Sequence, residues 1–237
     1  MAATVIYSDM GDVDCASIPL LWEGIPDIKL YRLAREKSYF KDELKKAIED
    51  EDDTLIICGH GTPYGLLGYL NTKDSGSSRF WLDDDTRDAD YERLRKSGGD
   101  RAGVLGPSAS RGNRPVEQPT VRTVLDTAVD RSMAKLFHAN RVICVWCHAS
   151  DYAEATGLYG FWSSMFISNV GEAHWCNIND VDQDTIVSET YKFWRDANKL
   201  LRENVPLDQW IEKLVEVGNM QYATTRFNYG GLRYYSK

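Results

Sequence analysis

Two short apolar runs in this chain each lead to a side chain that can take part in covalent chemistry. The first run, Thr54–Cys58, is followed by His60, and the second, Val142–Trp146, is followed by Cys147. Runs of this kind are typical of buried strands. In open α/β sheets, ligands bind beyond the carboxyl ends of the strands, so two such ends can face one crevice. A thiol and an imidazole brought together there form the minimal apparatus for nucleophilic catalysis.

Glycine flanks His60 on both sides, at positions 59 and 61. Glycine allows a tight approach of the backbone at the end of a strand. The N–H of Gly61 is well placed to stabilise an oxyanion, which is the largest single contribution in many acyl-transfer sites. A Gly-His-Gly sequence is a weak signal alone, and the later strand-end cysteine strengthens it.

The remaining cysteines fit a structural interpretation. The chain has five cysteines, at positions 15, 58, 144, 147 and 176. An odd number of cysteines in a chain without a secretion signal predicts reduced thiols. Cys58 and Cys144 lie inside the apolar runs and are expected in the core.

The sequence Cys144-Val-Trp-Cys147-His148 matches three further patterns. It spells the attachment motif of c-type haem, which requires export, and its cysteine pair has the spacing of a redox motif that belongs at a helix start. A structural zinc site is a third alternative, but strand alternation points Cys144 and Cys147 to opposite faces. The favoured prediction is a site without a metal and without a cofactor.

Strands and helices alternate in the first part of the chain. Apolar patterning predicts strands at 4–7, 28–33, 54–58 and 141–146, and a helix at 38–50 with Ser38 as its N-cap. Such units favour a parallel, doubly wound α/β sheet. Asp9, Asp12 and Asp14 follow the first strand, where we expect them to cap and solvate a loop, with a place in the crevice as the alternative.

The second half of the chain predicts further elements. These are helices at 124–137 and 155–169, a strand at 173–178, and two C-terminal helices at 183–203 and 207–217. Aromatic residues near the C-terminus are expected to pack rather than to bind a cofactor.

The segment from about 71 to 120 breaks this alternation. Its second half, Gly98–Pro119, is rich in Gly, Ser, Arg and Pro and offers little apolar surface to bury, which predicts a long flexible insert. We therefore expect a catalytic domain at 1–180 that contains this insert, and a helical extension at 181–237 packed on the same domain.

Composition restricts the function classes. The formal net charge is −8 and the isoelectric point is near 5.1, which argues against nucleic acid and against anionic membranes as partners. We find no signal peptide and no apolar run long enough to span a membrane, so a cytoplasmic location is expected.

The two strand-end motifs and their order resemble the caspase-like superfamily of cysteine peptidases, which includes metacaspases, clostripain-like enzymes and CHAT domains. Cys147-His148-Ala149-Ser150 is similar to the Cys-His-Ser-Gly of metacaspases, and Gly157–Ile167 with the following Val170-Gly-Glu-Ala-His-Trp resembles CHAT domains. The resemblance covers residues 4–178. It implies a caspase-like fold, His60 as the base or acid, Cys147 as the nucleophile, and the Gly61 N–H in the oxyanion hole.

The expected function is therefore a thiol protease that cleaves a protein or peptide through a thioester acyl-enzyme. Metacaspases carry an acidic residue two positions before the cysteine, where this chain has Val145, so the substrate preference stays open. Two alternatives also stay open: a non-catalytic binding or scaffold domain, and a thiol hydrolase of small amides or esters.

Overall fold

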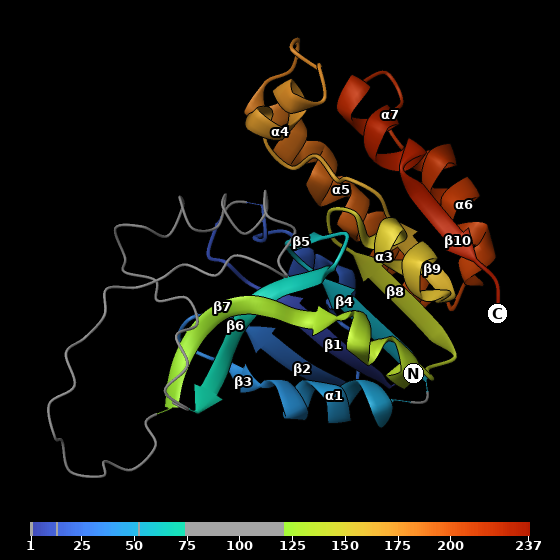
Figure 1. Cartoon of the computed structure of the whole chain (residues 1–237). Helices are drawn as coiled ribbons and strands as arrows, with labels where there is room; N and C mark the ends of the chain where they lie inside the picture. Colours follow the sequence, from blue (N-terminus) through green and yellow to red (C-terminus); the bar gives the residue numbers. More distant parts are fainter. Residues whose placement is uncertain (1, 13, 52, 74–120) are drawn as a thin grey trace, which may run out of the picture.

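The computed structural model describes residues 2–12, 14–51, 53–73 and 121–237 (Figure 1). Its main feature is a six-stranded sheet with the order β10-β9-β8-β4-β1-β2. The strands are β1 (Ala3–Ser8), β2 (Ile28–Leu33), β4 (Thr54–Cys58), β8 (Arg141–Val145), β9 (Gly160–Ser163) and β10 (Leu232–Tyr235). Neighbouring strands are parallel except β10, which runs antiparallel to β9. The predicted α/β class with a mostly parallel central sheet is confirmed.

Helices flank this sheet, and a smaller sheet lies beside it (Figure 1). The helices are α1 (Lys41–Glu49), α3 (Ala149–Thr156), α4 (Val170–Trp175), α5 (Gln183–Arg202), α6 (Trp210–Val217) and α7 (Ala223–Gly230), with short 3-10 helices at Ile18–Trp22, Arg131–Leu136 and Leu207–Gln209. The smaller sheet contains β3 (Tyr39–Phe40), β5 (Gly61–Thr62), β6 (Gly65–Lys73) and β7 (Val121–Asp130). Among the described residues, no helix combines the length and apolar composition that a membrane crossing requires.

The central strands are mainly apolar because both faces of the sheet are covered. Ile56 of β4 and Ile143 of β8 belong to a core cluster shared with α5 and α6. Leu55 and Val142, one residue earlier in each strand, belong to the opposite cluster with α1 and α3. Successive side chains of a strand point to opposite faces of the sheet, so each apolar strand contributes to both core clusters. This is expected for a parallel sheet that is covered on both sides.

The chain reverses its direction of travel across the sheet between β1 and β4. It passes from β1 to β2 on one side, and then returns to place β4 on the other side of β1, followed outward by β8 and β9. The connections that leave the carboxyl ends of β1 and β4 therefore lead toward opposite edges of the sheet. In sheets of this kind, that switch point is where ligands bind.

The predicted helix at 124–137 is wrong. The segment forms β7 and then a 3-10 helix at Arg131–Leu136. β7 pairs antiparallel with β6 along nearly its whole length, from Val121 opposite Lys73 to Asp130 opposite Gly65. This long-range pairing outweighs the local apolar spacing that suggested a helix.

Two predictions after Cys147 are also wrong. The expected helix at 155–169 is divided, because α3 ends at Gly157 in the left-handed region and the chain enters β9 at Gly160 with φ of 115°. The expected strand at 173–178 is occupied by α4, whose N-cap Asn169 accepts a hydrogen bond from the N–H of Glu172. Both glycines were visible in the sequence as helix breakers.

Other boundaries shift without changing the element. Phe40, not Ser38, is the N-cap of α1, and the Glu43 carboxylate accepts the N–H of Phe40. The two C-terminal helices are confirmed as α5 and α6. The C-terminal extension is not wholly helical, however, because β10 adds an edge strand to the central sheet.

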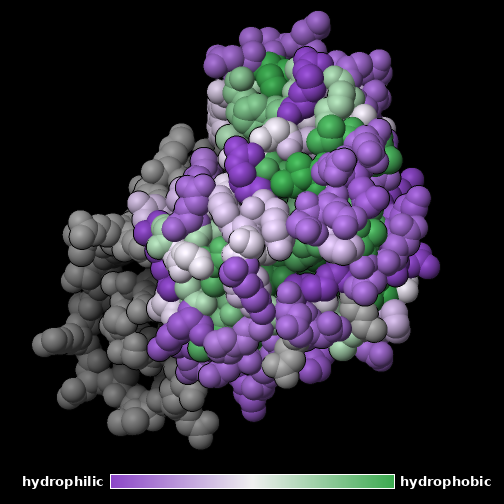
Figure 2. All heavy atoms as spheres, turned by 90° about the vertical axis from the view of Figure 1, so that its right-hand side faces the viewer, coloured by the Kyte–Doolittle hydropathy of each residue, from purple (hydrophilic) through white to green (hydrophobic). Residues whose placement is uncertain are grey.

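Two further predictions concern the aromatic residues near the C-terminus and the flexible insert. The aromatic tail packs as expected in part: Tyr229 is buried, while Tyr234 is exposed. The face of the molecule seen in Figure 2 is mostly hydrophilic, with hydrophobic side chains gathered toward its top and middle. Positions 74–120, which include the predicted flexible insert at Gly98–Pro119, lie outside the described residues.

Gly160 is required where β9 begins. A Cβ at this position would lie 2.4 Å from the carbonyl oxygen of Val142, and the φ of 115° is strained for any L side chain. We expect Gly160→Ala to lower the free energy of unfolding by about 2 kcal/mol or more. Gly230→Ala is the matched control, because a Cβ there meets nothing within 4 Å and alanine is the better helix former. Urea unfolding of both variants tests this; similar stabilities would contradict it.

Candidate functional site

A small, partly open pocket lies at the carboxyl ends of the central strands. His60 and Cys147, the two predicted site residues, both line it, together with Cys15 from the loop after β1. Trp194 of α5 and Glu172 of α4 form part of its other wall. The pocket therefore occupies the switch point of the sheet, beneath helices from the C-terminal part of the chain.

Close packing of two glycines fixes the main chain around His60. A Cβ on Gly59 would lie 2.5 Å from the Cβ of Ser8, at the end of β1. A Cβ on Gly61 would lie 2.1 Å from the indole of Trp146. The glycines flanking His60 are thus needed for contact with both neighbouring strand ends, which supports the predicted tight backbone approach.

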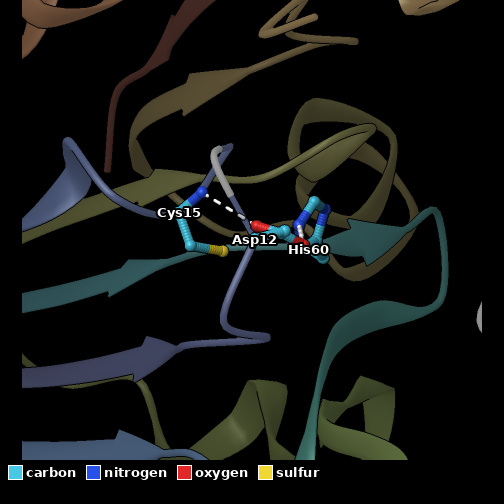
Figure 3. A group of neighbouring side chains, drawn as sticks. All are labelled: Asp12, Cys15 and His60. Atoms are coloured by element: carbon cyan, nitrogen blue, oxygen red, sulfur yellow. Dashed lines mark hydrogen bonds and ion pairs between the residues drawn. The ribbon is translucent and has the colours of Figure 1, made fainter. Parts of the chain in front are cut away.

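Asp12 holds the imidazole of His60. Its Oδ2 lies 2.8 Å from His60 Nε2, and its Oδ1 accepts the backbone N–H of Cys15 at 3.0 Å (Figure 3). The His60 side chain is buried, whereas that of Asp12 is one-third exposed. Asp9 and Asp12 cap the first loop as expected, and the alternative place in the crevice also holds, because Asp12 contacts His60 and Asp14 lines the pocket.

Cys15 is the site residue that the sequence analysis missed. Its ligand atom lies within 4.8 Å of those of Asp12 and His60, and its side chain is almost fully buried. The Sγ donates to the carbonyl of Ser8 at 3.3 Å, and the hydroxyl of Tyr7 donates to the carbonyl of Cys15 at 2.7 Å. The available signal was a thiol shortly after the first strand, a position that becomes informative once β1 and β4 are known to be neighbours.

The charges of this group shift the pKa of each member. Burial by itself lowers the pKa of His60, but Cys15 and the hydrogen-bonded Asp12 outweigh it and hold this pKa well above its usual value. Burial raises the pKa of Asp12, yet the His60 contact prevails and the pKa is lowered. Burial raises the pKa of Cys15 and of Asp14. The surroundings therefore favour an imidazolium beside a carboxylate.

Cys147 is partly exposed in the turn between β8 and α3. Its Sγ lies 3.7 Å from the carbonyl oxygen of Phe166. His148, the N-cap of α3, adopts a left-handed conformation with φ of 69°, and its N–H donates to Ser164. This sharp turn directs the chain from the strand into the helix immediately after the thiol.

The alternative ligand sets around Cys147 are not assembled. Cys144 is fully buried in the core on the α1 face of the sheet. The imidazole of His148 lies 2.8 Å from Asp151 on the exposed side of α3. Within the described ranges, Asp12, Cys15 and His60 form the one group of three or more potential metal ligands. Cys58 is fully buried, as predicted.

Gly61, the predicted oxyanion donor, is not among the residues that line the pocket; it begins β5 opposite Leu66 of β6. The N–H of Leu67 donates to the carbonyl of His60, so positions 60 and 67 form the hydrogen-bonded pair. Gly61 and Leu66 then form the adjacent non-hydrogen-bonded pair, in which the N–H points away from the partner strand. The N–H of Gly61 is therefore not used in pairing with β6.

Comparisons of the chain with protein-family models, with curated proteins and with solved structures find no match. The class that the structure itself defines is an α/β protein whose mostly parallel six-stranded sheet carries a histidine, a carboxylate and two thiols at its switch point.

The Asp12–His60 contact predicts a pH-dependent contribution to stability. Because the pKa of Asp12 is lowered from 3.8, its contribution is present above that value and is lost as the pH falls further. Because the pKa of His60 is raised from 6.5, its contribution is present below that value and is lost as the pH rises through the raised pKa. Between pH 3.8 and pH 6.5, Asp12→Asn should lower the free energy of unfolding by about 1 kcal/mol, and by less at higher pH.

Urea unfolding across this pH range measures the effect. Asp9→Asn is the control, because Asp9 lies in the same loop and pairs with Arg32, which stays charged throughout. The cost of that substitution should not change as the pH rises through the His60 pKa. A cost of Asp12→Asn that is independent of pH would contradict the charge assignment.

Proposed function

We propose that this protein is a cysteine endopeptidase in which Cys147 is the nucleophile and His60 the acid and base. The observation that carries the proposal is that both side chains line one pocket at the ends of the adjacent strands β4 and β8. Asp12, bonded to Nε2 of His60, orients the ring. This arrangement follows the general logic of a nucleophile, a base and a group that positions the base.

The reaction proceeds in two stages. Cys147 Sγ attacks the carbonyl carbon of the scissile peptide, while His60 accepts or already holds the thiol proton. The N–H of Gly61 stabilises the resulting oxyanion. The C–N bond then breaks as His60 gives the proton to the leaving amine, which leaves a thioester on Cys147. Water, deprotonated by His60, attacks the thioester and releases the acid and the free thiol.

Peptide electrophiles identify the nucleophile. We expect a peptide chloromethyl ketone to label Cys147, and Cys147→Ala to lose both this label and the hydrolysis of peptides. Cys144→Ala should retain both, because Cys144 is fully buried in the core. Cys15→Ala should retain the label, since the Cys15 side chain is almost fully buried and its Sγ donates to the carbonyl of Ser8. Mass spectrometry of digested protein locates the label; modification of Cys15 would overturn the assignment.

Polar atoms in the pocket suggest a substrate class. Within the described part of the chain, Asp14 Oδ1, Thr190 Oγ1 and Trp194 Nε1 are buried and have no hydrogen-bond partner. All three residues line the same pocket as Cys147. A buried polar atom without a hydrogen-bond partner destabilises the folded state, and a ligand that forms the missing hydrogen bonds removes this penalty. The carboxylate oxygen of Asp14 and the hydroxyl of Thr190 can both accept hydrogen bonds. They therefore favour a substrate group that donates hydrogen bonds, such as the cationic end of lysine or arginine.

The expected preference can be measured with matched peptides. Peptides with lysine or arginine before the scissile bond should be cleaved faster than those with norleucine. Asp14→Asn should reduce kcat/KM for the basic peptides by about 10- to 100-fold and leave the norleucine peptide nearly unchanged. Asp208→Asn, an exposed carboxyl on the helix after Pro206, is the control. Equal loss for all peptides would contradict recognition of the cation by Asp14, and cleavage of small amides alone would favour a hydrolase of another class.

A further inference from the structure

The group formed by Asp12, Cys15 and His60 has more features than a hydrogen bond to a catalytic ring requires. One carboxylate, one thiol and one imidazole converge from two loops, and their ligand atoms all lie within 4.8 Å of one another (Figure 3). The two loops leave the neighbouring parallel strands β1 and β4, so the sheet itself holds the three side chains together.

This donor set is suited to zinc. Zn²⁺ binds cysteine sulfur at about 2.3 Å and histidine nitrogen or carboxylate oxygen at about 2.0–2.2 Å, in tetrahedral geometry. Tetrahedral ligand atoms at these bond lengths are separated by about 3.3–3.8 Å. The 2.8 Å between Asp12 Oδ2 and His60 Nε2 would therefore widen slightly when zinc binds. The distances from the Cys15 sulfur to the other two ligand atoms are already no more than 4.8 Å. Three protein ligands leave a fourth position for water, as in zinc sites that exchange ligands.

The surroundings already fix the ligands. Asp12 is anchored through its second oxygen, which accepts the N–H of Cys15. The main chain of Cys15 is held by the hydroxyl of Tyr7, and Gly59 packs against Ser8 directly before His60. Contacts of this kind orient ligands and strengthen binding. Cys15 and His60 also line the open pocket, which gives an ion a path from solvent.

We propose that Asp12, Cys15 and His60 form a reversible Zn²⁺ site. Binding releases the thiol proton of Cys15, and any second proton on the imidazole, to solvent. The thiolate and the carboxylate balance the charge of the ion in this buried place. Resting on the proposed function, the bound ion also inhibits peptide cleavage, because an imidazole coordinated to zinc can no longer accept and return a proton.

Metal titration of the full chain tests the site without any activity assay. Protein treated with EDTA and dialysed is titrated with ZnCl₂ by calorimetry, and with Co²⁺ while the thiolate-to-cobalt absorption is recorded. The intact chain and Cys147→Ala should each bind one equivalent with the thiolate band. Cys15→Ala should lose the band and bind zinc at least about 100-fold more weakly, and Asp12→Asn should bind about 10- to 100-fold more weakly.

Circular dichroism and thermal unfolding without metal show whether each variant is folded. Should Cys15→Ala fail to fold, Asp12→Asn and the cobalt band of the intact chain still decide the matter. Unchanged zinc affinity in Asp12→Asn, or loss of the thiolate band in Cys147→Ala, would overturn the site. Zinc binding through Cys15 without peptide cleavage would support the metal site and disprove the peptidase. Peptide cleavage without zinc binding would support the peptidase and disprove the metal site.

Discussion

The site depends on how closely the carboxyl ends of β1 and β4 approach each other. Gly59 lies against Ser8 at a distance that leaves no room for a Cβ, and β1 and β4 pair in register up to Tyr7 opposite Cys58. Before the chain crosses over to β2, the loop after β1 lies against the end of β4. This loop carries Asp12 and Cys15 to His60. A side chain at position 59 would therefore clash with Ser8 at the end of β1, directly before the loop that carries Asp12 and Cys15.

Burial and charge in this pocket act against each other. An imidazolium as buried as His60 is unfavourable unless an anionic group lies beside it, and the carboxylate of Asp12 provides that compensation. Asp14 shares the pocket but has no partner for Oδ1, and burial raises its pKa. One carboxyl is thus committed to holding the ring, while the other is available to a ligand. The same cluster that stabilises a charged histidine leaves a polar surface next to Cys147.

Local sequence patterns were sufficient for the parts of the fold that bury apolar runs. The strands around Leu55 and Ile143 could be predicted because both of their faces enter a core. The pairing of β7 with β6 could not, because it joins segments far apart in the chain and leaves little local trace. The edge strand β10 was missed for a similar reason, since its partner β9 was itself assigned to a helix.

The candidate site shows the same division between local and long-range information. The shared pocket of His60 and Cys147 could be predicted because each residue follows a buried strand, and the rule for open sheets places such ends at one edge. Asp12 and Cys15 follow a strand as well, but their importance depends on which strand lies beside β1. That adjacency is a property of strand order, which a single sequence does not determine. The missing information was topological rather than chemical.

Two thiols share this pocket, and their surroundings separate their chemistry. Cys15 is almost fully buried, its sulfur donates to a strand-end carbonyl, and its raised pKa favours the neutral thiol. Cys147, in the turn between β8 and α3, is partly exposed and is the more accessible of the two thiols. Cys15 is instead a buried neighbour of His60. The position and charge of the imidazole are therefore set by side chains of the loop after β1.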